Sequence, residues 1–271
     1  MLNVTGRVRV SRKSVICFRS YGVYATICFI CCPARANFGF MSLAQFNEQV
    51  LPGAQKLGGW RALYLTFIDQ LNPRSILEIG CGGTAFLERL PSDIRRVAID
   101  GGDRFASDVE SLGAEFHAVD LDHDELPAIG PFDAVVCSDV LEHLIYPART
   151  IEYAAGLTGE GIFFSHVPNE FHWRRTLRIM LGRADTVYFH HGCEEWENPH
   201  LRRFSDAGFM RLLKRHFAYN LPLTDLRYTR VARLFQKVRL KPPYCLQGGP
   251  TYASTNDAAT FRELAVVKRR L

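Results

Sequence analysis

The chain has 271 residues, 47% of them apolar, which is enough for one large domain with a sizeable core. The formal charge of +5 is concentrated at the start, because residues 1–40 hold six basic and no acidic side chains, and residues 41–271 sum to about −1. The main part of the chain therefore shows no global electrostatic footprint for nucleic acid.

Residues 1–40 form a basic extension whose role the sequence leaves open. A basic start, RVRVSRK, precedes YGVYATICFICC and PARAN, which resembles a signal peptide with a small-x-small site at Ala34-Arg35-Ala36. The apolar run is too short for a comfortable membrane span. The alternatives are a misassigned or dispensable start, with Met41 beginning the functional chain, a targeting segment, and a genuine extension. We expect residues 41–271 to form the main domain.

The cysteines argue against a disulfide framework. Half of the eight lie in residues 1–40, and the other four, Cys81, Cys137, Cys193 and Cys245, form no CxxC pair. Reduced thiols in a cytosolic compartment fit a chain of this size better. We interpret Cys81 and Cys137 as small packing residues.

From about residue 57 the pattern alternates between helix and strand. We predict helices over 59–71, 84–90, 104–113, 148–157 and 205–217, and strands over 75–80, 95–100, 114–120, 132–139, 159–169 and 261–270. This alternation predicts right-handed crossovers and a mostly parallel sheet covered on both faces, with the last strand added antiparallel.

The stretch SILEIGCGGTAFLERL, residues 75–90, predicts a strand and a glycine-rich turn that hold a nucleotide-bearing cofactor. From Gly80 it satisfies the dinucleotide fingerprint, with alanine in the last place. From Glu78 it reads E-I-G-C-G. Gly80 and Gly82 would let the backbone approach the ligand, and Asp100, at the end of the second strand, would accept hydrogen bonds from ribose hydroxyls. A dinucleotide and the alternative cofactor, S-adenosylmethionine, both need these features.

Two further features distinguish between a dinucleotide and S-adenosylmethionine as the cofactor. A carboxylate at Glu78 would attract the amino group of S-adenosylmethionine (SAM) but repel a pyrophosphate. FDAVVCSDVLEHL, residues 132–144, resembles the fourth-strand block of class I SAM-dependent methyltransferases, and AVDLDHDELP resembles their third-strand end. The resemblance covers residues 75–216 and implies a Rossmann-like, doubly wound, seven-stranded, mostly parallel sheet. It also implies a SAM site lined by Glu78, Gly80, Gly82, Asp100, Asp120, Leu121 and Ser138. Thr84 departs from the family's G-x-G-x-G pattern.

The segment SDVLEHL holds the candidate catalytic group. In a helical turn, Asp139, Glu142 and His143 would share one face, where two carboxylates and an imidazole could bind a divalent cation. This resembles the E-x-x-E-H metal site of small-RNA 2′-O-methyltransferases and a similar block in ubiquinone-pathway O-methyltransferases. His200 or Asn169 would supply a further ligand. The alternatives are that His143 acts as a base or orients the acceptor, and that these residues only pack.

A lid is predicted over about residues 168–203, because some 35 residues separate the fifth strand from the next helix. Its P-N-x-x-H-W-R run resembles the methionine-biosynthesis W proteins, which implies a partner acyltransferase as one alternative. Its arginines are Arg174, Arg175, Arg178 and Arg183. They would meet an anionic acceptor or simply be solvated.

These features predict a SAM-dependent methyltransferase acting on a small-molecule, lipid or glycan acceptor, with oxygen as the preferred acceptor atom. One alternative is a non-catalytic or weakly catalytic partner protein of the same fold. Another is a metal-dependent RNA 2′-O-methyltransferase, against which the near-neutral domain stands. We expect a cytoplasmic site of action, because SAM is made and used there, and no stable membrane span. The acceptor and the oligomeric state stay open, since fold does not fix them.

Overall fold

The computed structural model describes residues 59–183, 200–227, 230–237 and 240–271. The extension over residues 1–40 lies outside the described residues, as do the middle of the predicted lid and Cys193. No helix in the described ranges is long and apolar enough to cross a bilayer.

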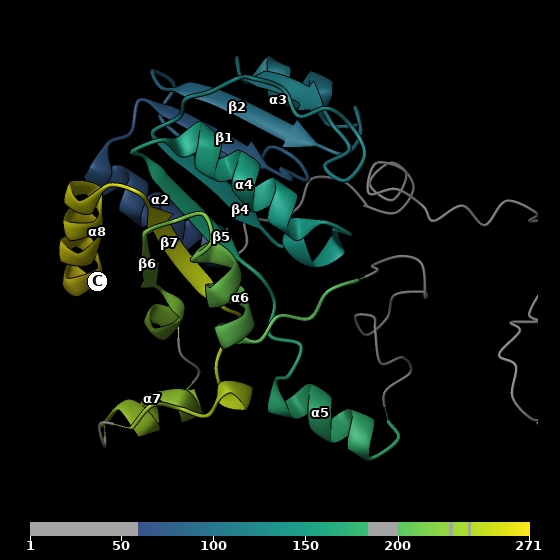
Figure 1. The fold of residues 1–271 in the computed structure, drawn as a ribbon, viewed down its shortest axis with the longest axis vertical. Helices are drawn as coiled ribbons and strands as arrows, with labels where there is room; N and C mark the ends of the chain where they lie inside the picture. The colour runs from purple at the N-terminus through teal and green to yellow at the C-terminus, as the bar shows by residue number, and fades with distance from the viewer. Residues whose placement is uncertain (1–58, 184–199, 228–229, 238–239) are drawn as a thin grey trace, which may run out of the picture. The chain divides into compact units, whose positions relative to one another are not determined.

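The core element is a seven-stranded sheet in the order β3-β2-β1-β4-β5-β7-β6. Its strands are β1 (Ser75–Ile79), β2 (Arg95–Asp100), β3 (Glu115–Ala118), β4 (Ala134–Ser138), β5 (Ile162–His166), β6 (Tyr219–Pro222) and β7 (Thr251–Thr255). Strands β1 to β5 are parallel, and β7 runs antiparallel to both β5 and β6. The predicted seven-stranded, mostly parallel sheet is therefore confirmed (Figure 1).

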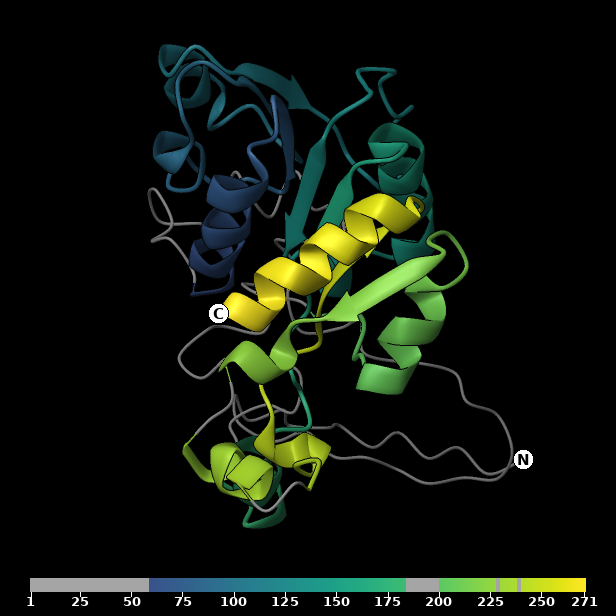
Figure 2. The ribbon, with the colours of Figure 1, turned by 90° about the vertical axis from the view of Figure 1, so that its left-hand side faces the viewer.

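Helices cover both faces of the sheet (Figures 1 and 2). The described helices are α2 (Gly59–Leu71), α3 (Ala106–Ser111), α4 (Pro147–Thr158), α5 (Trp173–Met180), α6 (Asp206–Leu213), α7 (Arg230–Lys237) and α8 (Ala258–Arg270). Of these, α2, α3 and α8 pack on one face of the sheet and α4 and α6 on the other. Short 3₁₀ helices are η1 (Leu87–Arg89), η2 (Leu141–His143), η3 (Thr224–Arg227) and η4 (Tyr244–Leu246).

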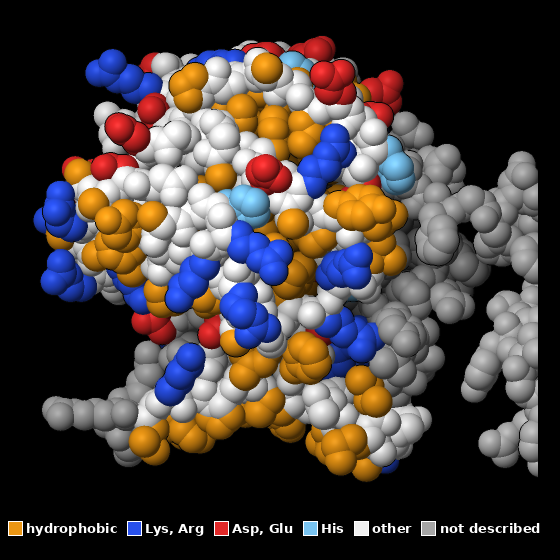
Figure 3. Space-filling view, viewed as in Figure 1, with side chains coloured by type: hydrophobic (Ala, Val, Ile, Leu, Met, Phe, Trp, Pro, Cys, Tyr) orange, Lys and Arg blue, Asp and Glu red, His pale blue; other side chains and the backbone are white. Residues whose placement is uncertain are grey.

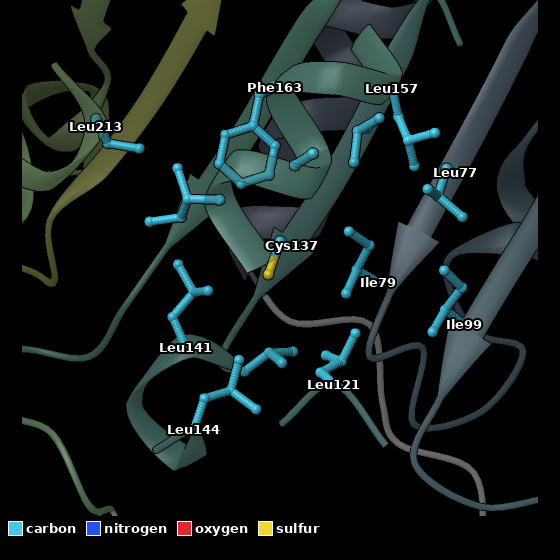
Figure 4. Packing of buried hydrophobic residues seen from close by; sticks show 14 of the residues in the cluster. Leu77, Ile79, Ile99, Leu121, Cys137, Leu141, Leu144, Leu157, Phe163 and Leu213 are labelled. Atoms are coloured by element: carbon cyan, nitrogen blue, oxygen red, sulfur yellow. The ribbon is translucent and has the colours of Figure 1, made fainter. Parts of the chain in front are cut away.

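Alternation along the buried strands divides the core into two layers. Leu77, Ile79 and Ile99 point to the layer beneath α4 and α6, which Figure 4 shows together with Phe163 and Leu213. The intervening side chains point to the layer beneath α2, α3 and α8. By the same alternation, Glu78 lies on the α2 side of the sheet.

Two predicted elements are wrong. The helix expected over 84–90 is only the 3₁₀ turn η1. Leu90 is extended, with φ −81° and ψ 147°, because the residue before a proline, here Pro91, disfavours helical conformation.

The strand expected over 261–270 is the second wrong prediction, since these residues lie in α8. The Asp257 side chain caps this helix by accepting a hydrogen bond of 2.6 Å from the Thr260 N–H. Leu264 and Val267, three residues apart, are its buried side chains, which is a helical spacing. The antiparallel strand beside β5 is instead β7, residues TYAST.

Candidate functional site

The carboxyl ends of β1 to β5 meet at one edge of the sheet. The chain order reverses at β1, which lies between β2 and β4. Open parallel sheets bind ligands outside the strand ends at such a reversal. Apart from His200, the predicted site residues lie in the last residues of these strands or within a few residues after them.

The turn after β1 has a left-handed backbone. Gly80, Gly82 and Gly83 have φ of 71°, 57° and 134°. The Gly80 N–H donates a 2.7 Å hydrogen bond to the Ile99 carbonyl, which joins the turn to the end of β2. A Cβ at Gly80 would lie 2.2 Å from Val140 Cγ2. The sequence therefore needs glycine at this position for conformation and for space.

Asp100, at the end of β2, holds this turn in place. Its Oδ2 accepts a 2.8 Å hydrogen bond from the Gly82 N–H, and its Oδ1 accepts one of 2.8 Å from the Gly101 N–H. Its Oδ2 also lies 3.6 Å from Cys81 Sγ, whose thiol can donate a hydrogen bond to it. A helix-capping role finds no support, since Phe105 precedes α3 and no side chain caps that helix.

Glu78 faces Arg61 of α2, a residue that the sequence reasoning missed. Arg61 Nε lies 2.9 Å from Glu78 Oε1, and Arg61 Nη2 donates a 2.9 Å hydrogen bond to the Gly80 carbonyl. Burial raises the pKa of Glu78 to about 8, although the Arg61 charge opposes the rise. Glu78 therefore pairs with Arg61, and its contact with a cofactor amino group stays a prediction. In the sequence, the helical spacing of Arg61, Tyr64 and Ile68 was the available signal that Arg61 lies on the buried face of α2.

The loop after β3 carries Asp120 and Leu121. Leu121 is buried in the core, and Asp120 accepts hydrogen bonds from the Asp122 N–H at 3.0 Å. Asp122 in turn accepts from the N–H groups of Ile145 and Tyr146, each at 2.9 Å. Its carboxylate therefore joins this loop to the segment that enters α4. Ser138 is buried at the end of β4.

Three of the four predicted metal ligands converge after β4. One ligand atom each from Glu142, His143 and His200 lies within 4.8 Å of the others. Glu142 and His143 belong to η2 rather than to an α-helix. Asp139 stands outside this group of three. Its φ of 57° is rare for a non-glycine residue, and its Oδ1 lies 3.5 Å from His166 Nε2.

His200 is fixed by residues at the start of the predicted lid. Its Nδ1 lies 2.7 Å from Oε1 of Glu170, a buried carboxylate whose other oxygen pairs with Arg175. The His143 ring meets the His200 ring edge-on, with centroids 4.7 Å apart. Such a carboxylate sets the orientation and tautomer of its histidine.

Glu142 is a buried carboxyl within this cluster. Burial raises its pKa well above the usual value, and the charges of Asp139 and Glu170 act in the same direction. Asn169, the other candidate ligand, is engaged elsewhere: its Nδ2 donates to the carbonyls of Tyr244 and Gln247. Asn169 therefore anchors the start of the segment predicted to be a lid.

Comparison with known proteins identifies the family. The methyltransferase domain family matches the chain over residues 54–237. The chain belongs to that family. The methyltransferase domain is accordingly of the predicted class I, SAM-dependent type, and SAM is its cofactor.

Curated relatives and solved structures agree with this assignment. A ubiquinone biosynthesis O-methyltransferase of Coxiella burnetii is 25% identical over 206 residues, covering 67% of this chain and 86% of the relative. Another, from Saccharophagus degradans, is 33% identical over 117 residues, covering 40% and 49% of the two chains. The methyltransferase domain also shares its fold with the plantazolicin methyltransferase BamL, solved with S-adenosylhomocysteine, at a TM-score of 0.50 and 15% identity, covering 73% and 85% of the two chains.

The residues of the methyltransferase domain fit SAM at the β1–β2 end. Gly80 and Gly82 place backbone without a Cβ at this strand end, and Asp100 supplies there the carboxylate that a ribose-binding site needs. Thr84, the departure from the family pattern, directs its hydroxyl to Glu88. The Thr84 side chain is thus engaged within the turn that follows the glycines.

His166 is a further residue that sequence reasoning missed. It ends β5, is buried, and holds its Nδ1 2.8 Å from Thr251 Oγ1 on β7. Its ring stacks on Trp60 of α2, with centroids 4.8 Å apart. A histidine at the end of a largely apolar strand was the local signal for it.

Proposed function

We propose that the protein transfers the methyl group of SAM to an oxygen atom of a small-molecule, lipid or glycan acceptor. The observation that carries this proposal is the imidazole group of His143, half-buried after β4 and ordered by the His200–Glu170 pair. The names of the curated relatives, which are O-methyltransferases, support oxygen as the acceptor atom.

SAM supplies an electrophilic methyl group on a sulfonium sulfur. The protein must hold the acceptor in line with that methyl group and receive the proton of the acceptor hydroxyl. We assign the proton to the His143 imidazole. The acceptor oxygen forms the new C–O bond as the S–C bond breaks, and the sulfur keeps that electron pair. Gly80, Gly82 and Asp100 position the donor, with Asp120, Leu121 and Ser138 as further lining residues. Glu78 acts on this turn indirectly, by pairing with Arg61, which donates a hydrogen bond to the Gly80 carbonyl.

The test combines acceptor screening with a matched pair of histidine variants. Transfer of labelled methyl from SAM would be screened over phenols, hydroxylated lipids and glycans, and the methylated atom assigned by NMR. We expect His143→Ala to lower kcat by roughly 10²- to 10⁴-fold, the usual contribution of a positioned base, without changing the Kd for SAM. His216→Ala, just after α6, is the control. Methylation at nitrogen alone, or full activity of His143→Ala, would contradict the proposal.

A divalent cation at Glu142, His143 and His200 is a second candidate. Two imidazoles and a carboxylate within 4.8 Å of one another match a common ligand set for divalent transition metals. A cation there would polarise the acceptor oxygen, and His143 would be a ligand instead of a base.

Metal content separates these two candidates. If the cation site exists, dialysis against EDTA and reloading with Mn²⁺ or Zn²⁺ should give one bound ion per chain. His200→Ala should lower this metal content, and His216→Ala should leave it unchanged. Retention of full activity in EDTA would instead leave His143 as the base. An RNA acceptor would further require EDTA-sensitive activity on a small-RNA 3′ end.

A further inference from the structure

The lid contains a cluster of exposed apolar side chains. In and around α5, six large apolar residues are at least 36% exposed, among them Met180 at 78% and Leu181 at 57%. The others are Phe171, Trp173, Leu177 and Ile179. No side chain of α5 is buried. Single exposed apolar residues are ordinary, but a contiguous group marks an interaction surface.

The orientation of α5 is fixed by one of its arginines. Arg175 turns toward the body of the protein and pairs with buried Glu170. At 3.6 residues per turn, Trp173, Leu177 and Met180 share an arc of about 60° on the opposite side of the helix. This stripe, with Phe171 and Leu181, is called the α5 apolar face below. It points away from the Glu170–His200 pair.

Basic residues border this face. Residues 171–183 contain four arginines and no acidic residue. Arg174 and Arg178 follow the apolar stripe at helical spacing and are exposed. The Arg174 guanidinium also lies 5.5 Å from the centroid of the Trp173 ring. An amphipathic helix with aromatic and aliphatic residues on one side and arginines beside them is typical of binding in a lipid–water interface.

A second helix, α7, lies at the same end of the methyltransferase domain as α5 (Figures 1 and 2) and also carries exposed apolar side chains. Both ribbon views place α7 and α5 at the lower end, and Figure 3 shows hydrophobic side chains along the edge that they form, with basic side chains above them. Leu234 and Leu240, in and after α7, are each 59% exposed. Residues 227–241 carry six basic and no acidic side chains.

The charge of the domain is therefore strongly divided. The segments 171–183 and 227–241 contribute +10 to a stretch, residues 41–271, that sums to about −1, so its other residues carry about −11. We propose that the α5 apolar face and α7 dock on an anionic lipid surface. Each basic side chain near such a surface adds about fivefold in affinity, and the exposed apolar groups insert among the headgroups. A second copy of this face would be repelled by like charge.

The test is co-sedimentation of the full chain with vesicles, either of phosphatidylcholine alone or of equal parts phosphatidylcholine and phosphatidylglycerol. We expect binding to the mixed vesicles that weakens with salt, and little binding to phosphatidylcholine. Leu177→Glu with Met180→Glu should lower the partition coefficient at least tenfold, and Arg174→Gln with Arg178→Gln about as much. The matched controls on exposed parts of α8, Val266→Glu and Arg269→Gln with Arg270→Gln, should stay within about twofold.

Unchanged SAM affinity would show that each variant is folded. Three results would overturn the proposal. One is no binding to anionic vesicles, and another is binding that neither α5 variant weakens, which would assign it to residues elsewhere in the chain. The third is self-association in sedimentation velocity that Leu177→Glu with Met180→Glu abolishes while vesicles are not bound, which would assign the face to a second copy of the chain.

Discussion

The two halves of the strand edge are built by different kinds of contact. At the β1–β2 end, the Asp100 carboxylate bonds to backbone N–H groups, and the glycine turn needs left-handed φ values. At the β4–β5 end, side chains bond to side chains, as in the Glu170–His200 pair. The first half therefore depends on backbone conformation and the second on side-chain identity. Substitutions in the first half should therefore lower stability and SAM affinity, and substitutions in the second half should lower kcat.

The largest effect is expected from Gly80→Ala. The substitution places a Cβ at positive φ and 2.2 Å from Val140 Cγ2. Strain and overpacking together should cost about 2–5 kcal/mol of unfolding free energy and abolish SAM binding. Chemical denaturation and calorimetric titration with SAM measure the two effects.

Gly113→Ala is the matched control for this variant. Its φ of 70° equals that of Gly80 within a degree, but the nearest atom to an added Cβ lies 3.8 Å away. It should show the backbone strain alone, about 1 kcal/mol, and keep SAM binding. Equal losses in the two variants would mean that the Val140 contact does not restrict the turn.

Asp100→Asn should weaken SAM binding without unfolding the protein. The amide keeps one oxygen acceptor but loses the charge that strengthens bonds to N–H and ribose hydroxyl groups. We expect the Kd for SAM to rise roughly 10- to 100-fold in calorimetric titration, with NAD silent throughout. Asp103→Asn, an exposed residue of the next loop, is the control. An unchanged Kd would remove Asp100 from the cofactor site.

Glu170→Gln tests the second half of the comparison. The glutamine keeps the shape of the side chain but weakens its hold on His200 and Arg175. We expect kcat to fall roughly tenfold, a typical cost of losing a carboxylate that orients a histidine, with the Kd for SAM unchanged. A shifted pH–rate profile would identify the orienting role. Glu160→Gln, exposed after α4, is the control. A parallel loss of SAM affinity would mean that the halves are not independent.

The same contrast explains how far the sequence could predict the site. The β1–β2 half is encoded within residues 75–100, so local spacing sufficed to place Gly80, Gly82 and Asp100 together. The β4–β5 half combines Glu142, Glu170 and His200, and His166 meets Thr251 across 85 positions of sequence. Such pairs join residues far apart in the sequence, which no local pattern records.

Element types were predictable where periodicity and end signals agreed. The strands β1 to β5 are short buried runs bounded by turns, and all five were expected. In FRELAVVKRR the apolar run AVV favoured a strand, and the Asp257 cap four residues upstream was overlooked. Arg61 was missed because a buried charge on an apolar helix face is interpretable only when its partner, Glu78, is known.

The remaining prediction concerns the pH dependence of stability that Glu78 gives to the first half. Its carboxyl has a pKa of about 8 in the folded state and an ordinary value of 4.5. Between these values the folded state binds more protons than the unfolded state, so stability should fall as pH rises from 4.5 to 8 and then level off. One such group contributes at most about 1.4 kcal/mol per pH unit.

Glu78→Gln should flatten this slope in thermal unfolding measured from pH 5 to 8, and Glu152→Gln, exposed on α4, should not. Glu142, whose pKa is also raised, acts in the same direction, so part of the slope should remain. A slope that Glu78→Gln leaves unchanged would mean that Arg61 keeps this carboxylate charged throughout the range. The ion pair would then stabilise the glycine turn at every pH at which the enzyme works.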